Sequence, residues 1–278
     1  MDPGERLDHL TSVERTLLLT LCGRAEDAKS AAPLLGDTVA EEISGKICES
    51  DRATATGADL SANVAIRTAQ LDQHVRKFLA EYPDAIIIEL GCGLETRMFR
   101  LDLPPRSNYY CIDSPAVIEL RRRLVPAHEQ ETGIAASLED SQWLDAVPTH
   151  RPTIIVADGV LTFLAPAEAI ELLNRLTAHF EHGELVCQAN ITYLTRDLGR
   201  VPELKRVGIP SPYRGFGIDD PTELERINPK LRFVEEFILA RSPQYFGGFS
   251  VKFRTILRLL RLRTRWARLS TWVLRYRF

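Results

Sequence analysis

The stretch of sequence that decides the fold runs from residue 86 to residue 100 and reads IIIELGCGLETRMFR. Its first five residues form a short apolar run, interrupted only by Glu89, which is typical of a buried parallel strand. Gly91 and Gly93 follow at once, and because glycine has no Cβ atom, the chain can turn tightly there and expose its backbone to a ligand. The segment after the turn can begin a helix, whose free N–H groups would point toward that ligand. The stretch therefore predicts a ligand site at the carboxyl end of a strand in an open α/β sheet.

The glycine turn lacks the spacing of a dinucleotide site. That fingerprint is G-x-G-x-x-G, whereas here Gly93 is followed by Leu94, Glu95 and Thr96. The pattern E-x-G-x-G resembles the first motif of class I S-adenosylmethionine methyltransferases, whose ligand has an amino-acid part and a ribose but no phosphate. An ordinary strand-turn-helix corner would carry the same letters, so the motif needs support from the rest of the chain.

Two further apolar runs end in polar or glycine residues, as the first one does. Residues 109–113 predict a strand that ends in an acid about 20 residues after the glycine turn, where a ribose-binding carboxylate belongs. Because a charged acceptor strengthens hydrogen bonds, Asp113 could hold both ribose hydroxyls. Residues 153–157 predict another strand, which Asp158 and Gly159 close. The ends of these three strands predict one cleft.

Four segments occur in an order and at a spacing that resemble the leucine carboxyl methyltransferase family: GCGLETRMFRLDL, YYCIDSPAVIELRRRLVP, AASLEDSQWLDAV and IIVADGVLTFL. The similarity is greater to its bacterial branch of tetracenomycin-type polyketide O-methyltransferases, and it extends from about Leu18 to the C-terminus. The segments GRAEDAKS and AIRT, upstream of the glycine turn, also match that branch. The resemblance implies S-adenosylmethionine as the cofactor and a small molecule as the methyl acceptor.

The resemblance also implies an α/β fold of the class I methyltransferase (Rossmann-like) type. We expect a mostly parallel sheet, an antiparallel last strand and an N-terminal helical cap. Residues 1–80 would form the cap, and residues 81–278 would form the S-adenosylmethionine-binding core with a substrate-side insertion at about 190–217.

Periodicity predicts the individual elements. Apolar residues at helical spacing predict cap helices at 7–21, 39–48 and 62–79, with Gly23 closing the first and a loop at 57–61 before the last. Further helices are predicted at 115–124 and 166–179. The remaining predicted strands are 134–136, 184–187, 231–240 and 272–278, of which the last two would pair antiparallel.

The resemblance assigns cofactor contacts to both parts of the chain. Arg67, on the last cap helix, would bind the carboxylate of S-adenosylmethionine through two parallel hydrogen bonds, and it could also contact the substrate. From the residues alone, Arg67 is a surface arginine of an amphipathic helix. Asp72 could orient Arg67 or face solvent. The expected cofactor-binding set is Arg67, Glu89, Gly91, Gly93, Asp113, Ser137, Leu138 and Asp158.

Two positions depart from the family pattern. Ser137 stands where the leucine carboxyl branch has an aspartate near the adenine, so the adenine contact could involve a hydroxyl, the backbone or Asp140. Asp158 stands where the family usually has a glutamate, and its reach is one methylene shorter. These departures leave open a second function, namely a cofactor-binding module that no longer methylates and acts through a partner or as a scaffold.

The predicted insertion at 190–217 would lie over the substrate side. Tyr193, Arg196 and Tyr213, together with Arg67, would then give the cleft cationic donors and aromatic walls for a flat, acidic or phenolic acceptor. A surface excursion without a ligand is the alternative. The predicted reaction is methylation of a carboxylate oxygen, which the resemblance slightly favours, or of a phenol or enol oxygen. No catalytic residue is assigned, because no serine, cysteine or histidine arrangement for covalent catalysis is evident.

Composition and patterning suggest where the protein works. A chain of 278 residues can form one large α/β domain with a cap. Its five cysteines lack C-x-x-C spacing, which argues against a zinc site and for reduced thiols. No apolar run approaches ~18 residues, so no membrane span is expected, and no secretory signal pattern is present. We therefore expect a cytoplasmic protein without a metal site; nothing indicates its oligomeric state.

Charge is divided unevenly along the chain. The residues from Arg241 onward include ten Lys or Arg and no acid, and since the whole chain has a net charge of −3, the first 240 residues carry −13. Five arginines in this tail recur every three or four residues, which predicts one arginine face on a helix: Arg254, Arg258, Arg261, Arg265 and Arg268. A membrane surface or a nucleic acid could use that face. Docking against the acidic remainder, or plain solvation, is the favoured interpretation, and no nucleic-acid partner is expected.

Overall fold

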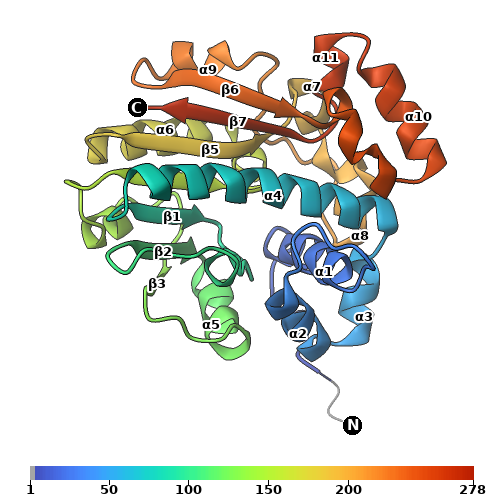
Figure 1. Ribbon diagram of the computed structural model, residues 1–278, viewed down its shortest axis with the longest axis horizontal. Helices are drawn as coiled ribbons and strands as arrows, with labels where there is room; N and C mark the ends of the chain where they lie inside the picture. The colour runs from blue at the N-terminus through green and yellow to red at the C-terminus, as the bar shows by residue number, and fades with distance from the viewer. Residues whose placement is uncertain (1–3) are drawn as a thin grey trace.

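The computed structural model of the chain describes residues 4–278, which build one seven-stranded sheet in the order β3-β2-β1-β4-β5-β7-β6 (Figure 1). Neighbouring strands from β3 to β5 are parallel, whereas β7 runs antiparallel to both β5 and β6. This confirms the expected mostly parallel sheet and the antiparallel pairing of its last two strands. The strands are β1 Ile86–Leu90, β2 Asn108–Asp113, β3 Glu131–Ala135, β4 Thr153–Ala157, β5 Gly183–Ala189, β6 Arg232–Ile238 and β7 Trp272–Arg277.

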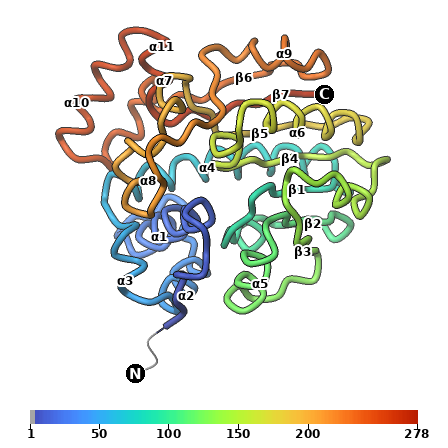
Figure 2. The backbone as a smooth tube through the Cα atoms, turned by 180° about the vertical axis from the view of Figure 1, so that it is seen from behind, coloured from blue at the N-terminus to red at the C-terminus, as the bar shows by residue number. Residues whose placement is uncertain are grey.

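Helices cover both faces of the sheet and extend past one of its ends (Figure 1). The long helix α4 crosses one face, and α6 lies on the other. Viewed from behind, α7, α8, α10 and α11 gather at the end of the sheet where α1 also lies (Figure 2). The helices are α1 Leu17–Ala28, α2 Thr38–Lys46, α3 Glu49–Arg52, α4 Ala58–Glu81, α5 Pro115–Leu124, α6 Pro166–His179, α7 Thr192–Thr195, α8 Pro202–Arg206, α9 Thr222–Ile227, α10 Val251–Leu260 and α11 Thr264–Ala267.

Successive side chains of β1 alternate between the two faces of the sheet, as a pleated strand requires. Ile88 and Leu90 pack in the cluster that includes α6, while Ile87 packs in the cluster that includes α4. Glu89 shares the face of Ile87, so its carboxylate is directed to the α4 side. Because of this alternation, only polar groups on the α4 side of the sheet can contact the Glu89 carboxylate.

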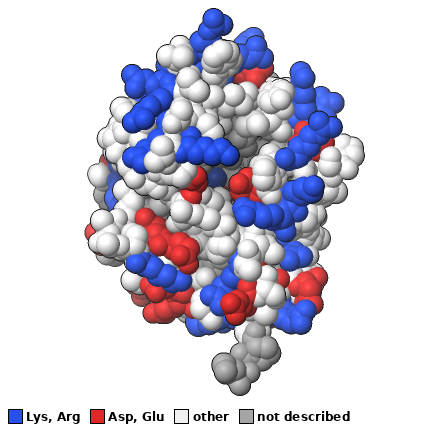
Figure 3. Space-filling view, turned by 90° about the vertical axis from the view of Figure 1, so that its right-hand side faces the viewer, with Lys and Arg blue, Asp and Glu red and all other residues white. Residues whose placement is uncertain are grey.

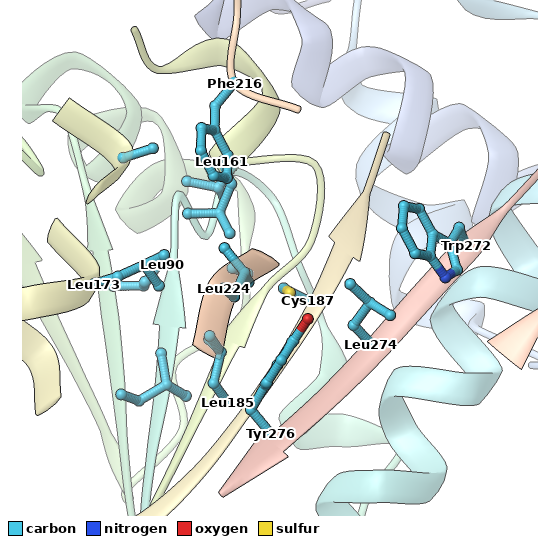
Figure 4. Packing of buried hydrophobic residues seen from close by; sticks show 14 of the residues in the cluster. Leu90, Leu161, Leu173, Leu185, Cys187, Phe216, Leu224, Trp272, Leu274 and Tyr276 are labelled. Atoms are coloured by element: carbon cyan, nitrogen blue, oxygen red, sulfur yellow. The ribbon is translucent and has the colours of Figure 1, made fainter. Parts of the chain in front are cut away.

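The α6 side of the sheet holds the largest apolar cluster, shown in Figure 4. Side chains of β5 and β7 meet those of α9 there, with Leu185, Leu224, Leu274 and Tyr276 fully or almost fully buried. The hydroxyl group of Tyr276 donates a hydrogen bond of 2.8 Å to the carbonyl oxygen of Pro221, so no polar group of this side chain is left unsatisfied. The antiparallel strand β7 thereby joins the C-terminal segment to the core.

The N-terminal helices differ from the prediction at three points. The first helix, predicted at 7–21, begins at Leu17 after a 3₁₀ turn, and it continues through Gly23 to Ala28. A Cβ atom at Gly23 would lie only 2.7 Å from the Cβ atom of Val64, so this glycine allows α1 to pack closely against α4 and does not end the helix. The predicted loop at 57–61 is wrong because α4 begins at Ala58.

No long helix follows the glycine turn. Residues 97–99 form a single 3₁₀ turn instead of the helix that the sequence suggested. Two causes are visible: the side chains of Arg97 and Arg100 are held in buried ion pairs, and Pro104 and Pro105 follow within a few residues. The turn therefore offers backbone groups to a ligand without the dipole of a helix behind them.

The C-terminal arginines do not share one helix face. Helix α10 ends at Leu260, and the short α11 begins only at Thr264. Arg268 lies beyond α11, where it is buried over the ring of Trp272 at 4.8 Å and pairs with Glu236 at 3.0 Å. The prediction of one continuous arginine face is therefore wrong. The favoured interpretation, in which these arginines dock against the acidic remainder of the chain, is correct for Arg268 and for Arg265. Arg265 contacts Asp219 at 3.6 Å.

No helix within residues 4–278 has both the length and the apolar character needed to cross a bilayer. No group of three or more His, Cys, Asp or Glu side chains in the same range is arranged to hold a metal ion.

Candidate functional site

A cavity of about 580 Å³ lies where the central strands end, between the sheet and the N-terminal helices. Its walls come from α1 and α4, from the turns after β1, β2, β4 and β5, and from the chain around α10 and α11. Figure 3 shows a hollow on this side of the molecule, with acidic and basic side chains at its edges. The volume falls in the range of about 300–1,000 Å³ that is usual for small-molecule sites.

The turn after β1 forms one wall through its backbone. Gly91 and Gly93 have φ angles of 56° and 48°, which side chains of L-residues rarely tolerate. A Cβ atom at Gly91 would also lie 2.7 Å from a methyl carbon of Val160. Both glycines line the cavity, so a ligand can approach the main chain closely, as the sequence predicted.

Asp113 lies at the end of β2 and lines the same cavity. Its Oδ2 atom accepts a hydrogen bond of 2.8 Å from the amide of Gly93, and its Oδ1 atom accepts one of 2.7 Å from the amide of Ser114. Each carboxylate oxygen keeps a second acceptor position, so Asp113 can accept both hydroxyls of a diol. Burial raises the pKa of Asp113 to about 6, in spite of these two amide donors.

Arg67 and Asp158 meet across the cavity wall. Nε of Arg67 lies 2.6 Å from Oδ1 of Asp158, with the two side chains 16% and 8% exposed. The contact lacks hydrogen-bond geometry, so within the described residues both buried atoms are without a hydrogen-bond partner. The pair brings one positive and one negative group to the cavity wall, which suits a ligand with a carboxylate and an amino group.

Glu89 is held on the α4 side of the sheet, although it also borders the cavity. Its Oε2 atom accepts hydrogen bonds from Nε of Arg97 at 3.0 Å and from the hydroxyl of Tyr109 at 2.5 Å. Burial raises the pKa of Glu89 in spite of the neighbouring Arg97. The carboxylate thus fixes the side chain of Arg97.

Arg97 belongs to a larger set of charged side chains, which we call the buried network. Asp72 pairs with both Arg97 and Arg100, so it neither orients Arg67 nor faces solvent. Although burial opposes it, Arg24, Arg100 and Arg97 hold the pKa of Glu95 well below its usual value. The buried network consists of Arg24, Asp37, Asp72, Glu89, Glu95, Arg97 and Arg100.

Of the residues expected near the adenine, one lines the cavity and the others do not. Leu138 lines the cavity beyond the end of β3. Ser137 is exposed, and its hydroxyl oxygen accepts a hydrogen bond of 3.2 Å from the amide of Glu139. Asp140 is exposed as well. Of these positions, the structure brings only Leu138 together with Gly91, Gly93 and Asp113 on the cavity wall.

The structure does not bring the expected substrate residues of the insertion to the cavity. The side chain of Tyr193 is 68% exposed and Arg196 is exposed too. Tyr213 donates a hydrogen bond of 2.7 Å to the carbonyl oxygen of Phe163 and packs edge-on against that ring. Phe163 itself lines the cavity, so Tyr213 supports the wall from behind.

Several polar residues of the wall were missed from the sequence. Asn63 precedes Arg67 by one helical turn on α4, and that spacing could have identified it. Gln188 and Asn190 follow the pattern of polar residues at a strand end, here β5. The side-chain amide of Asn190 donates a hydrogen bond of 3.1 Å to the hydroxyl of Thr162. Glu14, whose carboxylate accepts from Ser114 beside Asp113, lies in a 3₁₀ turn without any motif.

Comparisons with known proteins agree with this geometry. The sequence profile of the family "Leucine carboxyl methyltransferase" matches residues 18–177. The tetracenomycin polyketide synthesis O-methyltransferase TcmP of Streptomyces glaucescens is 37% identical over 240 residues, which cover 86% of this chain and 87% of TcmP. The S-adenosyl-L-methionine-dependent methyltransferase dpfgK of Gibberella zeae is 31% identical over 261 residues, with 86% and 87% covered.

Solved structures share the fold at low sequence identity. A DUF574 family protein from Streptomyces avermitilis superposes with a TM-score of 0.56 at 17% identity, over 90% of this chain and 98% of that one. The plantazolicin methyltransferase BamL has a TM-score of 0.50 at 12% identity, over 95% and 98% of the two chains. The profile match and the identity to TcmP decide the assignment, and the chain belongs to the leucine carboxyl methyltransferase family.

Proposed function

We propose that this protein uses S-adenosylmethionine to methylate an oxygen atom of a small, polyketide-like metabolite. The observation that carries the proposal is the cavity, because one wall has the features of a cofactor site and the rest of the lining is mostly apolar, as an acceptor site requires. The names of two relatives support it, since TcmP is an O-methyltransferase of polyketide synthesis and dpfgK depends on S-adenosylmethionine.

The residues of the first wall fit this cofactor. The main chain of Gly91 and Gly93 borders the cavity where its amino-acid part would lie, and Asp113 offers acceptors to two ribose hydroxyls. Arg67 and Asp158 bring one guanidinium and one carboxylate to the cavity wall, which suits a ligand with a carboxylate and an ammonium group. When bound, the cofactor supplies an electrophilic methyl group to an acceptor oxygen in line with its leaving sulfur. The protein then aligns the two molecules and excludes water.

The rest of the cavity lining is mostly apolar. Leu17, Leu60, Phe163 and Leu204 contribute side chains from four separate elements, and the amide groups of Asn190 and Gln188 supply isolated polar contacts. A flat, largely apolar acceptor suits such a chamber, because its scaffold is desolvated while one polar edge remains hydrogen-bonded.

The distribution of charge bears on the acceptor oxygen. Of the wall residues in the described part of the chain, Arg67 is the one cation, and it faces the proposed cofactor wall. A carboxylate acceptor would have to share this arginine with the carboxylate of the cofactor. We therefore favour a phenol or enol oxygen over a carboxylate, which reverses the slight preference drawn from the family resemblance.

The proposal is tested by incubating the protein with methyl-labelled S-adenosylmethionine and a panel of phenolic, enolic and carboxylic aromatic compounds. Mass spectrometry should detect a labelled methyl ether or ester for at least one of them. Tight binding of the cofactor without any methylated product across the panel would support the alternative of a cofactor-binding module that no longer methylates.

The pH dependence of turnover distinguishes the two kinds of oxygen. A phenol, with a pKa near ~10, should react faster as the pH rises from about 6 to 9 at saturating cofactor, unless a base assists. A carboxylate, with a pKa near ~4, is ionised throughout that range, so its turnover should stay flat. A flat profile with an ester product would contradict our preference for a phenol or enol.

A further inference from the structure

Exposed apolar side chains are concentrated in the C-terminal segment. Seven large apolar residues are exposed between residues 4 and 278, and five of them fall in the sixteen residues from 251 to 266. Their exposed fractions range from 40% to 71%, which leaves most of these side chains in water: Val251, Ile256, Leu259, Leu262 and Trp266. A cluster of this kind marks an interaction surface more often than single exposed residues do.

The same segment carries basic side chains that the fold does not neutralise. Arg265 and Arg268 reach acids of the core, as described above. Four others are exposed, and within residues 4–278 none of them has a carboxylate oxygen within 4.0 Å: Lys252, Arg258, Arg261 and Arg263. We call these four cations and the five apolar residues the docking face. Figure 3 shows Lys and Arg side chains gathered in the upper part of the molecule above the hollow.

The arrangement along α10 separates an inner and an outer side. Leu257 is fully buried and Phe253 is half-buried, so this side of the helix faces the protein. Val251 and Leu259 lie two turns apart on the opposite side, 70% and 59% exposed. Lys252 and Arg258 flank this outer apolar stripe. An outward apolar stripe between basic residues is the pattern of helices that lie in the surface of a membrane.

We propose that the docking face binds the surface of an anionic lipid bilayer. The charged side chains of the docking face are all positive, because the chain from residue 241 to the end has no acid. Anionic headgroups are therefore attracted to the whole docking face. Three of its apolar side chains lie on α10, Leu262 lies in the turn after it and Trp266 lies on α11, and a fluid surface can accept all of them without a matching groove. Trp266, at 48% exposed, has the amphipathic ring that prefers the boundary between headgroups and acyl chains.

The docking face also adjoins the cavity. Phe253, on the inner side of α10, and Leu269, just after α11, both line the cavity wall. A bilayer on the docking face would therefore be separated from the cavity by α10 alone, and a lipophilic acceptor held in it would be close to the proposed site of methyl transfer. This last consequence rests on the proposed function, whereas binding to the bilayer does not.

Sedimentation with lipid vesicles tests the proposal without any methyl transfer. The full chain is mixed with vesicles of pure phosphatidylcholine or of phosphatidylcholine with one third phosphatidylglycerol, and the bound fraction is measured at low and physiological salt. We expect binding to the anionic vesicles that weakens as salt rises, and much weaker binding to the neutral ones. Tryptophan fluorescence should shift to shorter wavelength on binding, because Trp143 and Trp272 are already buried and Trp266 is not.

Paired variants separate the docking face from general surface effects. Leu259→Ser with Leu262→Ser should reduce vesicle affinity by at least about ten-fold, since two apolar side chains no longer insert. Arg258→Gln with Arg261→Gln should reduce it by about 25-fold, at about five-fold for each charge. Leu34→Ser, which is 46% exposed elsewhere, and Arg106→Gln with Arg122→Gln are the matched controls and should bind like the parent.

All variants change exposed side chains, and thermal unfolding can verify that each variant is folded. A loss of vesicle binding can therefore be attributed to the substituted side chains. Absence of binding to anionic vesicles at low salt would overturn the proposal and leave an acidic protein as the partner of this face. Equal binding to neutral and anionic vesicles, or equal losses in the control variants, would overturn it as well. Loss of the fluorescence shift in Trp266→Phe, with vesicle binding retained, would support it.

Discussion

The buried network and the docking face use arginine in opposite ways. In the buried network, Arg97 is fully buried and contacts the carboxylates of Asp72 and Glu89. On the docking face, Arg258 and Arg261 are exposed, and no carboxylate of residues 4–278 lies within 4.0 Å of them. The comparison teaches that the position of a charge, and not its presence, decides whether it fixes a structure or remains available to a partner.

The two arrangements differ in how much stability the protein loses when one charge is removed. Removing one partner of a buried pair leaves the other charge without water and without a counter-ion, so buried pairs can be lost only at a high cost in stability. Exposed cations keep their hydration and contribute little to folding. We therefore expect mutations in the buried network to change stability and mutations on the docking face to change association alone.

The largest effect should follow the loss of Arg97. Arg97→Met keeps much of the side-chain volume but leaves Glu89 without a cationic partner and Asp72 with Arg100 alone. The free energy of unfolding should fall by about 3–5 kcal/mol, as measured by urea denaturation. Arg258→Met on the docking face is the control, and it should change the same quantity by less than about 0.5 kcal/mol. Equal effects of the two substitutions would remove the contrast between the regions.

A smaller loss is expected from the glycine turn. Gly91→Ala places a Cβ atom 2.7 Å from Val160 and forces alanine to adopt a φ angle of 56°. The free energy of unfolding should fall by about 1–3 kcal/mol, and cofactor binding should weaken with it. Gly45→Ala, inside α2 with nothing within 4 Å of the new atom, should instead raise stability by about 0.5–1 kcal/mol. A neutral Gly91→Ala would show that the turn is less constrained than its geometry indicates.

Arg67 should affect binding more than folding. Arg67→Lys keeps the positive charge but loses the planar pair of donors, so affinity for S-adenosylhomocysteine should fall about ten-fold. Calorimetric titration measures this change, and the melting temperature should stay within about 1 °C of the parent. Arg76→Lys, an exposed position on the same helix, serves as the control. Unchanged affinity and turnover in Arg67→Lys would place Arg67 outside the cofactor site.

The smallest predicted effect concerns pH. Burial raises the pKa of Asp113 to about 6, and ribose hydroxyls donate to its ionised form. Affinity for S-adenosylhomocysteine should therefore be constant above about pH 7 and should fall by up to about ten-fold per pH unit below about pH 6. Asp113→Asn should bind more weakly and lose this dependence. A parent protein with constant affinity from pH 5 to 8 would exclude protonation of Asp113 as a control on binding.

Much of the proposed cofactor wall was predictable because its signals are local. The strand before Gly91, the two glycines and the acid at the end of β2 are neighbours in sequence, and parallel pairing of β1 with β2 then brings Asp113 to the amide of Gly93. Sequence patterns of this kind predict where a strand lies and where it ends. That information is sufficient to place the two glycines and Asp113.

The regions that were mispredicted depend on partners far away in the sequence. Arg97 is drawn into pairs with Asp72 and Glu89, so the expected helix after the turn is reduced to a 3₁₀ turn. Arg268 pairs with Glu236, 32 residues earlier, and leaves the predicted arginine face. No periodicity encodes these contacts.

The insertion at 190–217 shows a different limit of sequence reasoning. Its residue types suggested a substrate wall, but composition does not state which way a side chain points. The structure directs Tyr193 outward and places Tyr213 behind Phe163. The wall is formed instead by apolar residues whose letters are indistinguishable from ordinary core residues.

The measurement that tests our account most directly is calorimetric titration of S-adenosylhomocysteine into the parent protein and into Asp113→Ala at pH 7.5. We predict micromolar-range affinity for the parent. We expect at least about ten-fold weaker binding for the variant, which loses charge-assisted hydrogen bonds to the ligand. Thermal unfolding checks that the variant is folded, because the amides of Gly93 and Ser114 also lose their acceptor. No heat of binding with the folded parent protein, or equal affinities of the two proteins, would contradict the assignment of the cavity as the cofactor site.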